Sequence, residues 1–221
     1  MSGPGKAGED ADYTVRPPLQ QRSKEAWERT LAAGVELLRE GGYAAFTIAA
    51  VCERAAVPPR AIYARVDTKE ALFLAVYEYG LAQVRQQIGQ VFDGVSPSCN
   101  SARPLVREVV QGIAGVFHHH EAFLKPILLL SSTHPEVHRR GSAYSQELGE
   151  NFVAALQSRI PQIPHQDRTE ALHLCFGIVH AAVVMRTMYG PGFAVPTVSP
   201  ERFADSLADA ATRYLFSRPM E

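Results

Sequence analysis

Residues 21–70 contain a pair of short helices joined by a tight turn, and this feature constrains the fold more than any other. Thr47 is a good N-cap for a helix from Ile48 to about Ala55, because its hydroxyl accepts a free backbone N–H. Pro59 can begin the next helix, to about Val66, without losing a hydrogen bond. Two short helices with a connection of this length are typical of a helix-turn-helix, whose second helix lies in the DNA major groove.

A longer helix precedes this pair. Its apolar residues recur at helical spacing on one face: Trp27, Leu31, Val35 and Leu38. Gly41-Gly42 ends it, since glycine tolerates the left-handed residue that commonly follows a helix. We therefore expect a DNA-binding unit over residues 21–67, an arm without periodicity at 1–20 and a larger helical region at 68–221. Composition favours a solvated tail for the arm, with minor-groove contact as the alternative.

A specific series of residues runs through the first unit. In order it reads Gly42-Tyr43, Thr47-Ile48, Ala50-Val51, Glu53-Arg54-Ala55, Val57, Ile62-Tyr63 and Thr68-Lys69-Glu70-Ala71-Leu72. With this series the segment resembles the TetR family of bacterial transcriptional regulators. The resemblance implies an all-α protein, with a three-helix DNA-binding domain followed by a larger helical domain for ligand and dimer contacts.

The segment departs from the family pattern in several places, including Arg65-Val66, where these proteins usually carry a His/Tyr-Phe pair. Ala56 stands where these proteins usually carry glycine, and an alanine at positive φ costs about 1 kcal/mol. Pro58 stands where a serine usually caps the recognition helix, and it offers no hydroxyl to a phosphate. The departures at Ala56 and Pro58 motivate an alternative function, a helical small-molecule-binding protein of the same fold without specific DNA recognition.

Three residues of the expected recognition helix are candidates for reading DNA. Arg60 lies in the first turn, which points at base edges, where it could contact a guanine or equally a phosphate. Ala61 could meet a thymine methyl group. Arg65 lies one turn further on and could reach the backbone or a base.

The resemblance adds three candidates for phosphate contact. Tyr63 occupies the family position whose hydroxyl holds a phosphate, although its ring could also pack in the small core. Lys69 matches the family lysine at the start of the following helix. Thr47 similarly combines a hydroxyl with a helix N-terminus.

The region after residue 68 reads as one helix after another, separated by Gly, Pro and polar clusters. The expected helices span residues 68–92, 104–120, 121–131, 136–160, 168–188 and 200–217. The middle ones combine apolar stripes with a few polar groups, which suits an enclosed site for a hydrophobic or aromatic small molecule. The candidate ligand-binding residues are Phe117, Leu128, Tyr144, Leu148, Phe152, Phe176 and His180.

The last two helices predict a homodimer. Helix 168–188 is apolar on more than one face and must be covered on two sides. Helix 200–217 carries an apolar stripe that includes Phe203, Leu207 and Tyr214. A two-fold dimer built from these helices would match a palindromic operator. Burial of both helices inside one protomer is the alternative.

Composition and spacing argue against several other classes. The net charge of −1 gives no global basic bias, so affinity for double-stranded DNA would depend on a few placed cations. Cys52, Cys99 and Cys175 lack metal spacing and favour a reducing cytoplasm. No signal peptide is visible, and the apolar stretch from Leu174 to Met185 is too short to cross a bilayer, so we expect no membrane partner.

No catalytic or cofactor-binding motif stands out, so neither an enzyme nor a cofactor is expected. His118-His119-His120 does not predict a metal site, because adjacent helical residues point about 100° apart. The sequence therefore predicts a cytoplasmic, ligand-responsive transcriptional regulator. Repression of a palindromic operator, relieved by the small molecule, is favoured, and activation is left open.

Overall fold

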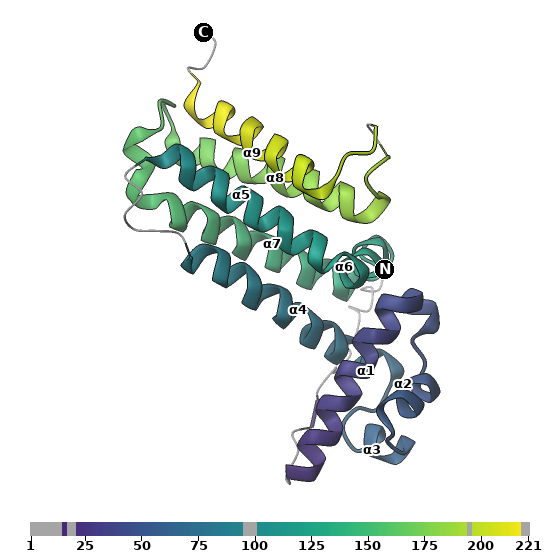
Figure 1. Cartoon of the computed structure of the whole chain (residues 1–221). Coiled ribbons are helices and arrows are strands. Elements are labelled where there is room, and N and C mark those ends of the chain that lie inside the picture. Colours follow the sequence, from purple (N-terminus) through teal and green to yellow (C-terminus); the bar gives the residue numbers. More distant parts are fainter. Residues whose placement is uncertain (1–14, 17–20, 95–100, 194–195, 218–221) are drawn as a thin grey trace, which may run out of the picture.

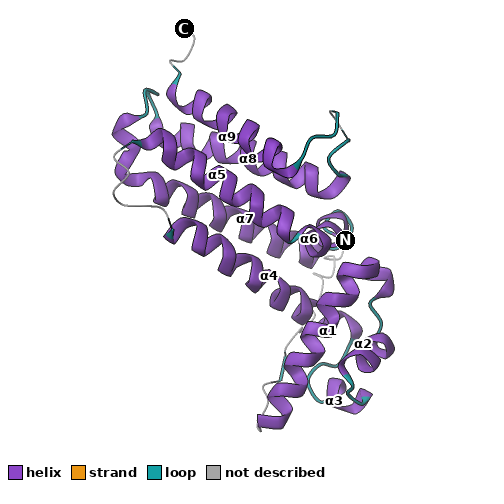
Figure 2. Cartoon of the chain, in the orientation of Figure 1, coloured by secondary structure: helices purple, strands orange, loops and turns teal. Residues whose placement is uncertain are grey.

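The computed structural model describes residues 15–16, 21–94, 101–193 and 196–217, and these residues form helices, turns and loops without a strand (Figure 1, Figure 2). The α-helices are α1 (Gln21–Ala45), α2 (Ile48–Ala55), α3 (Pro59–Tyr63), α4 (Lys69–Asp93), α5 (Ala102–His119), α6 (Glu121–Leu130), α7 (Pro135–Leu156), α8 (Arg168–Tyr189) and α9 (Pro200–Phe216), and the 3-10 helix η1 (Gln157–Gln162) follows α7. In Figure 1, α1 to α3 form a small unit at one end, and α4 runs from it along the remaining helices. The expected all-α fold is confirmed.

Helix boundaries agree closely with the sequence pattern, with two differences. The helix expected over 136–160 ends at Leu156 and continues as η1. The recognition helix ends at Tyr63, three residues before the expected Val66. Most of the loop expected at 94–104, with Cys99, and most of the 1–20 arm lie outside the described residues.

The small unit has its own apolar core. In α1, Leu31, Val35 and Leu38 are buried, as their spacing predicted. Gly42 breaks the helical path at φ 63°, ψ −159°, and one more helical turn continues to Ala45. Gly41-Gly42 therefore marks a kink rather than the final end of the helix.

The turn between α2 and α3 contains a strained residue. Thr47 caps α2 by accepting a hydrogen bond from the N–H of Ala50 at 3.1 Å. At the other end, Ala56 has φ 52° and ψ 48°, and it is the single non-glycine residue with positive φ in the described part of the chain. Buried Val57 and Ile62 fix the angle between the two helices. The position where the family usually carries glycine is thus left-handed here too.

α4 belongs to both halves of the molecule. Its N-cap Thr68 accepts from the N–H of Ala71 at 3.0 Å. Phe73 packs edge-on against Tyr43 and Phe46 of the small unit, with ring centroids 4.8 and 5.7 Å apart. Further along α4, a Cβ added at Gly80 would come within 2.3 Å of the Phe123 ring, so glycine is required for α6 to approach.

The remaining helices form a layered bundle in which α9 lies against α5 and α8 (Figure 1). The buried face of α9 consists of Leu207, Ala208, Ala211 and Leu215. α8 is 22 residues long and apolar enough to cross a membrane, by length and composition alone. The prediction of no membrane partner was based only on the shorter stretch from Leu174 to Met185, which is too short to do so. A core helix of a soluble protein passes the same test, so this feature is weak evidence for a membrane span.

The left-handed Ala56 predicts a stabilising substitution. Ala56→Gly should remove a conformational cost of roughly 1–2 kcal/mol, offset by a glycine entropy cost of roughly 0.5–1 kcal/mol. We expect the free energy of unfolding to rise by up to about 1 kcal/mol, measured by urea denaturation of the full chain. Ala49→Gly, at an exposed right-handed position of α2, is the matched control and should lower it. A decrease with Ala56→Gly would contradict this account of the turn.

Candidate DNA-reading surface and effector cavity

The exposed edge of α2 and α3 carries the candidate DNA contacts. Thr47 and Arg60 are exposed, and Arg60 lies in the first turn of α3. Tyr63 is 50% exposed, so its hydroxyl is available to a partner rather than buried in the core of the small unit. Ala61 is half-buried against that core, which limits its reach toward a thymine methyl group.

Arg65 was expected to contact DNA, and its position in the structure contradicts that role. Its side chain is buried, with 8% of the residue exposed. The guanidinium donates to the carbonyl oxygen of Arg16 at 3.0 Å and contacts the Ser23 hydroxyl. Arg16 in turn pairs with Asp67 at 2.7 Å, and its N–H donates to the Arg65 carbonyl at 3.0 Å. Arg65 therefore fastens the chain before α1 to the α3–α4 turn, and Arg16 is engaged in the same contact.

Lys69 lies at the first residue of α4, beside a polar cluster that joins the two halves. Its Nζ is 4.4 Å from the centroid of the Tyr43 ring. The Tyr43 hydroxyl donates to Glu70 at 3.0 Å, and burial together with this carboxylate raises the pKa of Tyr43 to about 12. The tyrosine is therefore a neutral donor at physiological pH.

The same carboxylate contacts α7. Nδ1 of His134 accepts the N–H of Val137, capping α7, so Nε2 carries a proton and donates to Glu70. Glu70, which follows Lys69 in α4, is thus hydrogen-bonded to His134, the N-cap residue of α7.

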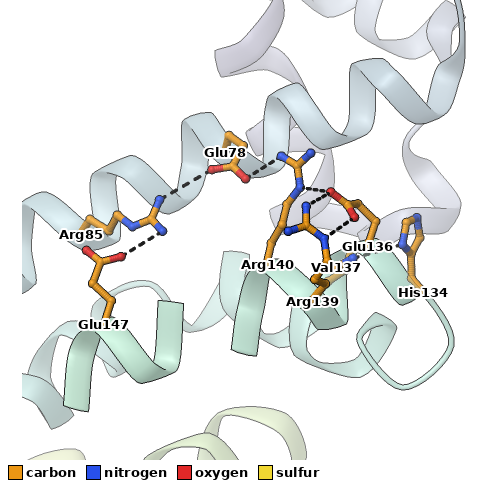
Figure 3. Close-up of polar contacts among 8 residues, drawn as sticks. All are labelled: Glu78, Arg85, His134, Glu136, Val137, Arg139, Arg140 and Glu147. Atoms are coloured by element: carbon orange, nitrogen blue, oxygen red, sulfur yellow. Dashed lines mark hydrogen bonds and ion pairs between the residues drawn. The ribbon is translucent and has the colours of Figure 1, made fainter. Parts of the chain in front are cut away.

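Two more ion pairs connect α4 and α7 further along. Arg140 pairs with Glu78 at 2.7 Å, and Arg85 pairs with Glu147 at 3.3 Å (Figure 3). Glu136 also accepts hydrogen bonds from Arg139 and Arg140. These bonds lower the pKa of its carboxyl to about 2. We call the three pairs Glu70–His134, Glu78–Arg140 and Arg85–Glu147 the α4–α7 ladder.

A cavity of about 190 Å³ lies between these two helices and α5, α6 and α8. Its lining residues are Tyr77, Leu81, Phe117, Phe123, Leu124, Ile127, Leu128, Ser131, Val137, His138, Gly141, Ser142, Tyr144, Ser145, His180 and Val184. Larger recesses, beside Trp27 and beside His165, are open grooves on the surface. The cavity between α4 and α7, which is less open to solvent than these grooves, is therefore the best candidate for an effector site.

The structure brings four of the seven candidate ligand residues to this cavity: Phe117, Leu128, Tyr144 and His180. The other three do not line it, because Leu148, Phe152 and Phe176 fill the core, with the Phe152 and Phe176 rings 5.7 Å apart. Sequence reasoning missed Tyr77 and Leu81. One sequence signal could have identified them. α4 carries more apolar residues than are needed to cover a single face of the helix.

The polar groups of the cavity are mostly neutral. The Ser145 hydroxyl is 3.2 Å from Nε2 of His180, whose pKa is lowered by burial. The His180 ring stacks on Phe176 at 5.4 Å. Burial raises the pKa of Tyr144 to about 12, and its hydroxyl has no hydrogen-bond partner within the described ranges.

α8 leaves an apolar stripe on the outside of the protomer. Leu174, Ile178, Met185 and Tyr189 are 54, 55, 42 and 47% exposed, and they follow one another at spacings of four or seven. Gly177 and Ala181 are also exposed between them. In α9, by contrast, the expected stripe turns mainly inward: Leu207 is buried, and Phe203 and Tyr214 are half-buried. The free apolar surface of this protomer thus comes chiefly from α8.

Among the described residues, no group of three or more His, Cys, Asp or Glu side chains is placed to hold a metal ion. His120 is buried, and neither ring nitrogen has a partner in the described parts of the chain. Burial is the main cause that lowers its pKa.

Comparisons with known proteins agree with this geometry. Residues 31–76 match the family described as bacterial regulatory proteins, tetR family. A search of curated proteins gave no significant match. Among solved structures, a TetR-family regulator from Mesorhizobium loti is 17% identical, with TM-score 0.70 over 87% of this chain and 97% of that one.

Two further structures are similar to the same extent. A tetR-family protein from Rhodococcus RHA1 is 16% identical, with TM-score 0.64 over 86% of this chain and 96% of that one. The TetR-family regulator PfmR from Thermus thermophilus is 19% identical, with TM-score 0.59 over 84% and 97%. At these identities the likeness shows the shared fold.

The chain is therefore an all-α protein of the class of DNA-binding transcriptional regulators. Residues 31–76 form a domain of the TetR type, and the described helices have the fold of TetR-family regulators. The resemblance inferred from the order of residues in the first unit is confirmed.

The two arginines of the α3 region should respond differently to truncation. Arg60→Ala should leave the Tm unchanged but weaken binding to a selected operator by about 10–100-fold, with relaxed preference at one base pair. Arg65→Ala should instead lower stability by about 1–3 kcal/mol, since the buried side chain and its hydrogen bonds to the Arg16 carbonyl and the Ser23 hydroxyl are lost. Thermal unfolding and competition binding on the same samples measure both. A stable Arg65→Ala protein with altered base preference would return Arg65 to the DNA-reading surface.

Proposed function

We propose that the protein is a ligand-responsive repressor that binds a palindromic operator and is released by a hydrophobic or aromatic small molecule in the cavity. The observation that carries this proposal is the double role of α4. Its first residues, Lys69 and Glu70, adjoin the DNA-reading surface, while Tyr77 and Leu81 line the cavity two to three turns later. One rigid element therefore connects the two sites.

The proposed mechanism follows from the ladder. A molecule in the cavity separates α4 from α7, and Glu70–His134 transmits that movement to the end of α4 next to the small unit. In a dimer, a change in the direction of α4 alters the spacing of the two recognition helices, which must match successive major grooves. A coupling free energy of about 1–3 kcal/mol would suffice for useful induction.

The proposed dimer forms through the α8 stripe, with α9 alongside. An exposed run of large apolar side chains on one helix is the usual mark of a protein interface. The outward surface of α9 combines charged residues with the small residues Ser206 and Ala210, so it can lie at the border of that interface.

The alternative, a binding protein of this fold without specific DNA recognition, is favoured by one observation. Pro58 caps α3 without a side-chain hydrogen bond. This alternative function predicts weak, salt-sensitive binding to any DNA sequence, with ligand binding intact.

Removing the two phosphate-contact candidates tests the DNA-binding proposal. The double variant Tyr63→Ala/Lys69→Ala should lose protection of the operator in a footprint on DNA upstream of the protein's own gene, because a hydroxyl and an ammonium no longer meet the backbone. Lys125→Ala, an exposed lysine on α6, is the control and should footprint as the unmodified protein does. An unchanged footprint for the double variant would contradict this assignment. Uniform weak binding by the unmodified protein would favour the alternative.

A charge in the middle of the α8 stripe tests the dimer. Ile178→Asp should convert the protein from dimer to monomer, because an unpaired carboxylate cannot be buried in an apolar contact. Leu129→Asp changes a similarly exposed leucine on α6 and should leave the dimer intact. Sedimentation analysis of both variants measures the assembly. A dimeric Ile178→Asp protein would show that another surface forms the interface.

A further inference from the structure

The size of the cavity limits what can occupy it. An apolar cavity of about 150 Å³ accommodates one benzene molecule. The cavity here, at about 190 Å³, is only slightly larger, and its lining also includes the exposed residues His138 and Ser142. Five helices supply its walls: Tyr77 from α4, Phe117 from α5, Phe123 from α6, Tyr144 from α7 and His180 from α8. It matches a single ring with a short substituent.

The charge of the lining limits the occupant further. In the described chain no Asp, Glu, Lys or Arg lines the cavity. The nearest guanidinium, that of Arg85, lies 4.9 Å from the Tyr144 ring centroid and is already paired with Glu78 and Glu147 (Figure 3). A charged group would be transferred from water to this site without a counter-ion, which is strongly unfavourable. An uncharged molecule is favoured.

One polar pair gives the cavity a direction. Ser145 and His180, 3.2 Å apart, both line it and come from α7 and α8. A hydroxyl and a neutral imidazole together can donate to and accept from one oxygen atom. α6 adds apolar side chains to the lining, those of Phe123, Leu124 and Ile127.

We infer that the effector is an uncharged molecule about the size of one substituted ring, with a single hydrogen-bonding oxygen that meets Ser145 and His180. This inference rests on the proposed function, since it assigns the chemical class of the molecule that releases the operator. Its apolar body occupies the space between α4 and α6, and its oxygen points toward the α7–α8 side.

Direct binding to the full-length protein without DNA tests the chemical class. The probes are acetophenone and 4-methylphenol, which are neutral with one oxygen, against benzoate and benzylammonium, which match them in size and carry a charge. At pH 8, where ordinary histidines are neutral, calorimetry and thermal unfolding should show binding and a raised Tm for the neutral pair alone. Equal or tighter binding of benzoate or benzylammonium would overturn the inference.

Filling the cavity shows whether binding occurs there. A Cβ at Gly141, which lines the cavity, would meet only the Tyr77 hydroxyl at 4.0 Å, so Gly141→Leu can enter the space without a clash. It should abolish binding of both neutral probes. The matched control is Gly115→Leu on the exposed face of α5, where an added Cβ meets no described atom within 4 Å, and it should bind normally. Binding that survives Gly141→Leu would place the probes elsewhere and overturn the inference.

Ser145→Ala tests the polar pair. It should weaken acetophenone binding by about tenfold, as expected for one lost hydrogen bond, and leave ethylbenzene, which has no oxygen, unaffected. Equal losses for both compounds would contradict the role of Ser145. Operator release is then measured separately. Neutral probes that bind in the cavity without releasing DNA would refute the proposed function and leave the ligand class standing. Release of the operator only by a charged or much larger compound would refute the inferred ligand class and leave the proposed function standing.

Discussion

The coupling proposed for this protein depends on the contact between α4 and α7. These helices approach each other through three polar pairs, and the cavity takes up the space where apolar side chains would otherwise meet. The two partly exposed ion pairs, Glu78–Arg140 and Arg85–Glu147, contribute only about 0–1 kcal/mol each to stability. Their importance is geometric, because each pair fixes one point of α4 relative to α7. A contact that is specific in position but weak in energy suits a helix that must move.

Helix positions followed from the sequence because the signals are local. Thr47 and Pro59 act within one turn of their own position, so this cap and the boundaries of these helices were predictable to within a few residues. Burial depends on residues far apart in the chain. Arg65 was misassigned because its partners, Arg16 and Ser23, lie more than forty positions away and no local pattern connects them.

The cavity illustrates the same limit. An apolar stripe shows that a helix face is covered, but not whether the space beneath it is filled. Phe152 and Phe176 fill it with their own rings, whereas Phe117 and Tyr144 border an opening. The role of α4 as a cavity wall was missed because the effector site was expected among the middle helices alone.

The uncharged lining of the cavity has a consequence for how a signal would reach the protein. A molecule that carries no charge and little polar surface crosses a lipid bilayer unaided, since the main barrier to permeation is the transfer of charged and polar groups into hydrocarbon. A sensor with such a cavity needs no dedicated uptake system. Its occupancy would follow the concentration of the compound outside the cell, so the protein would report on the surroundings as directly as on metabolism.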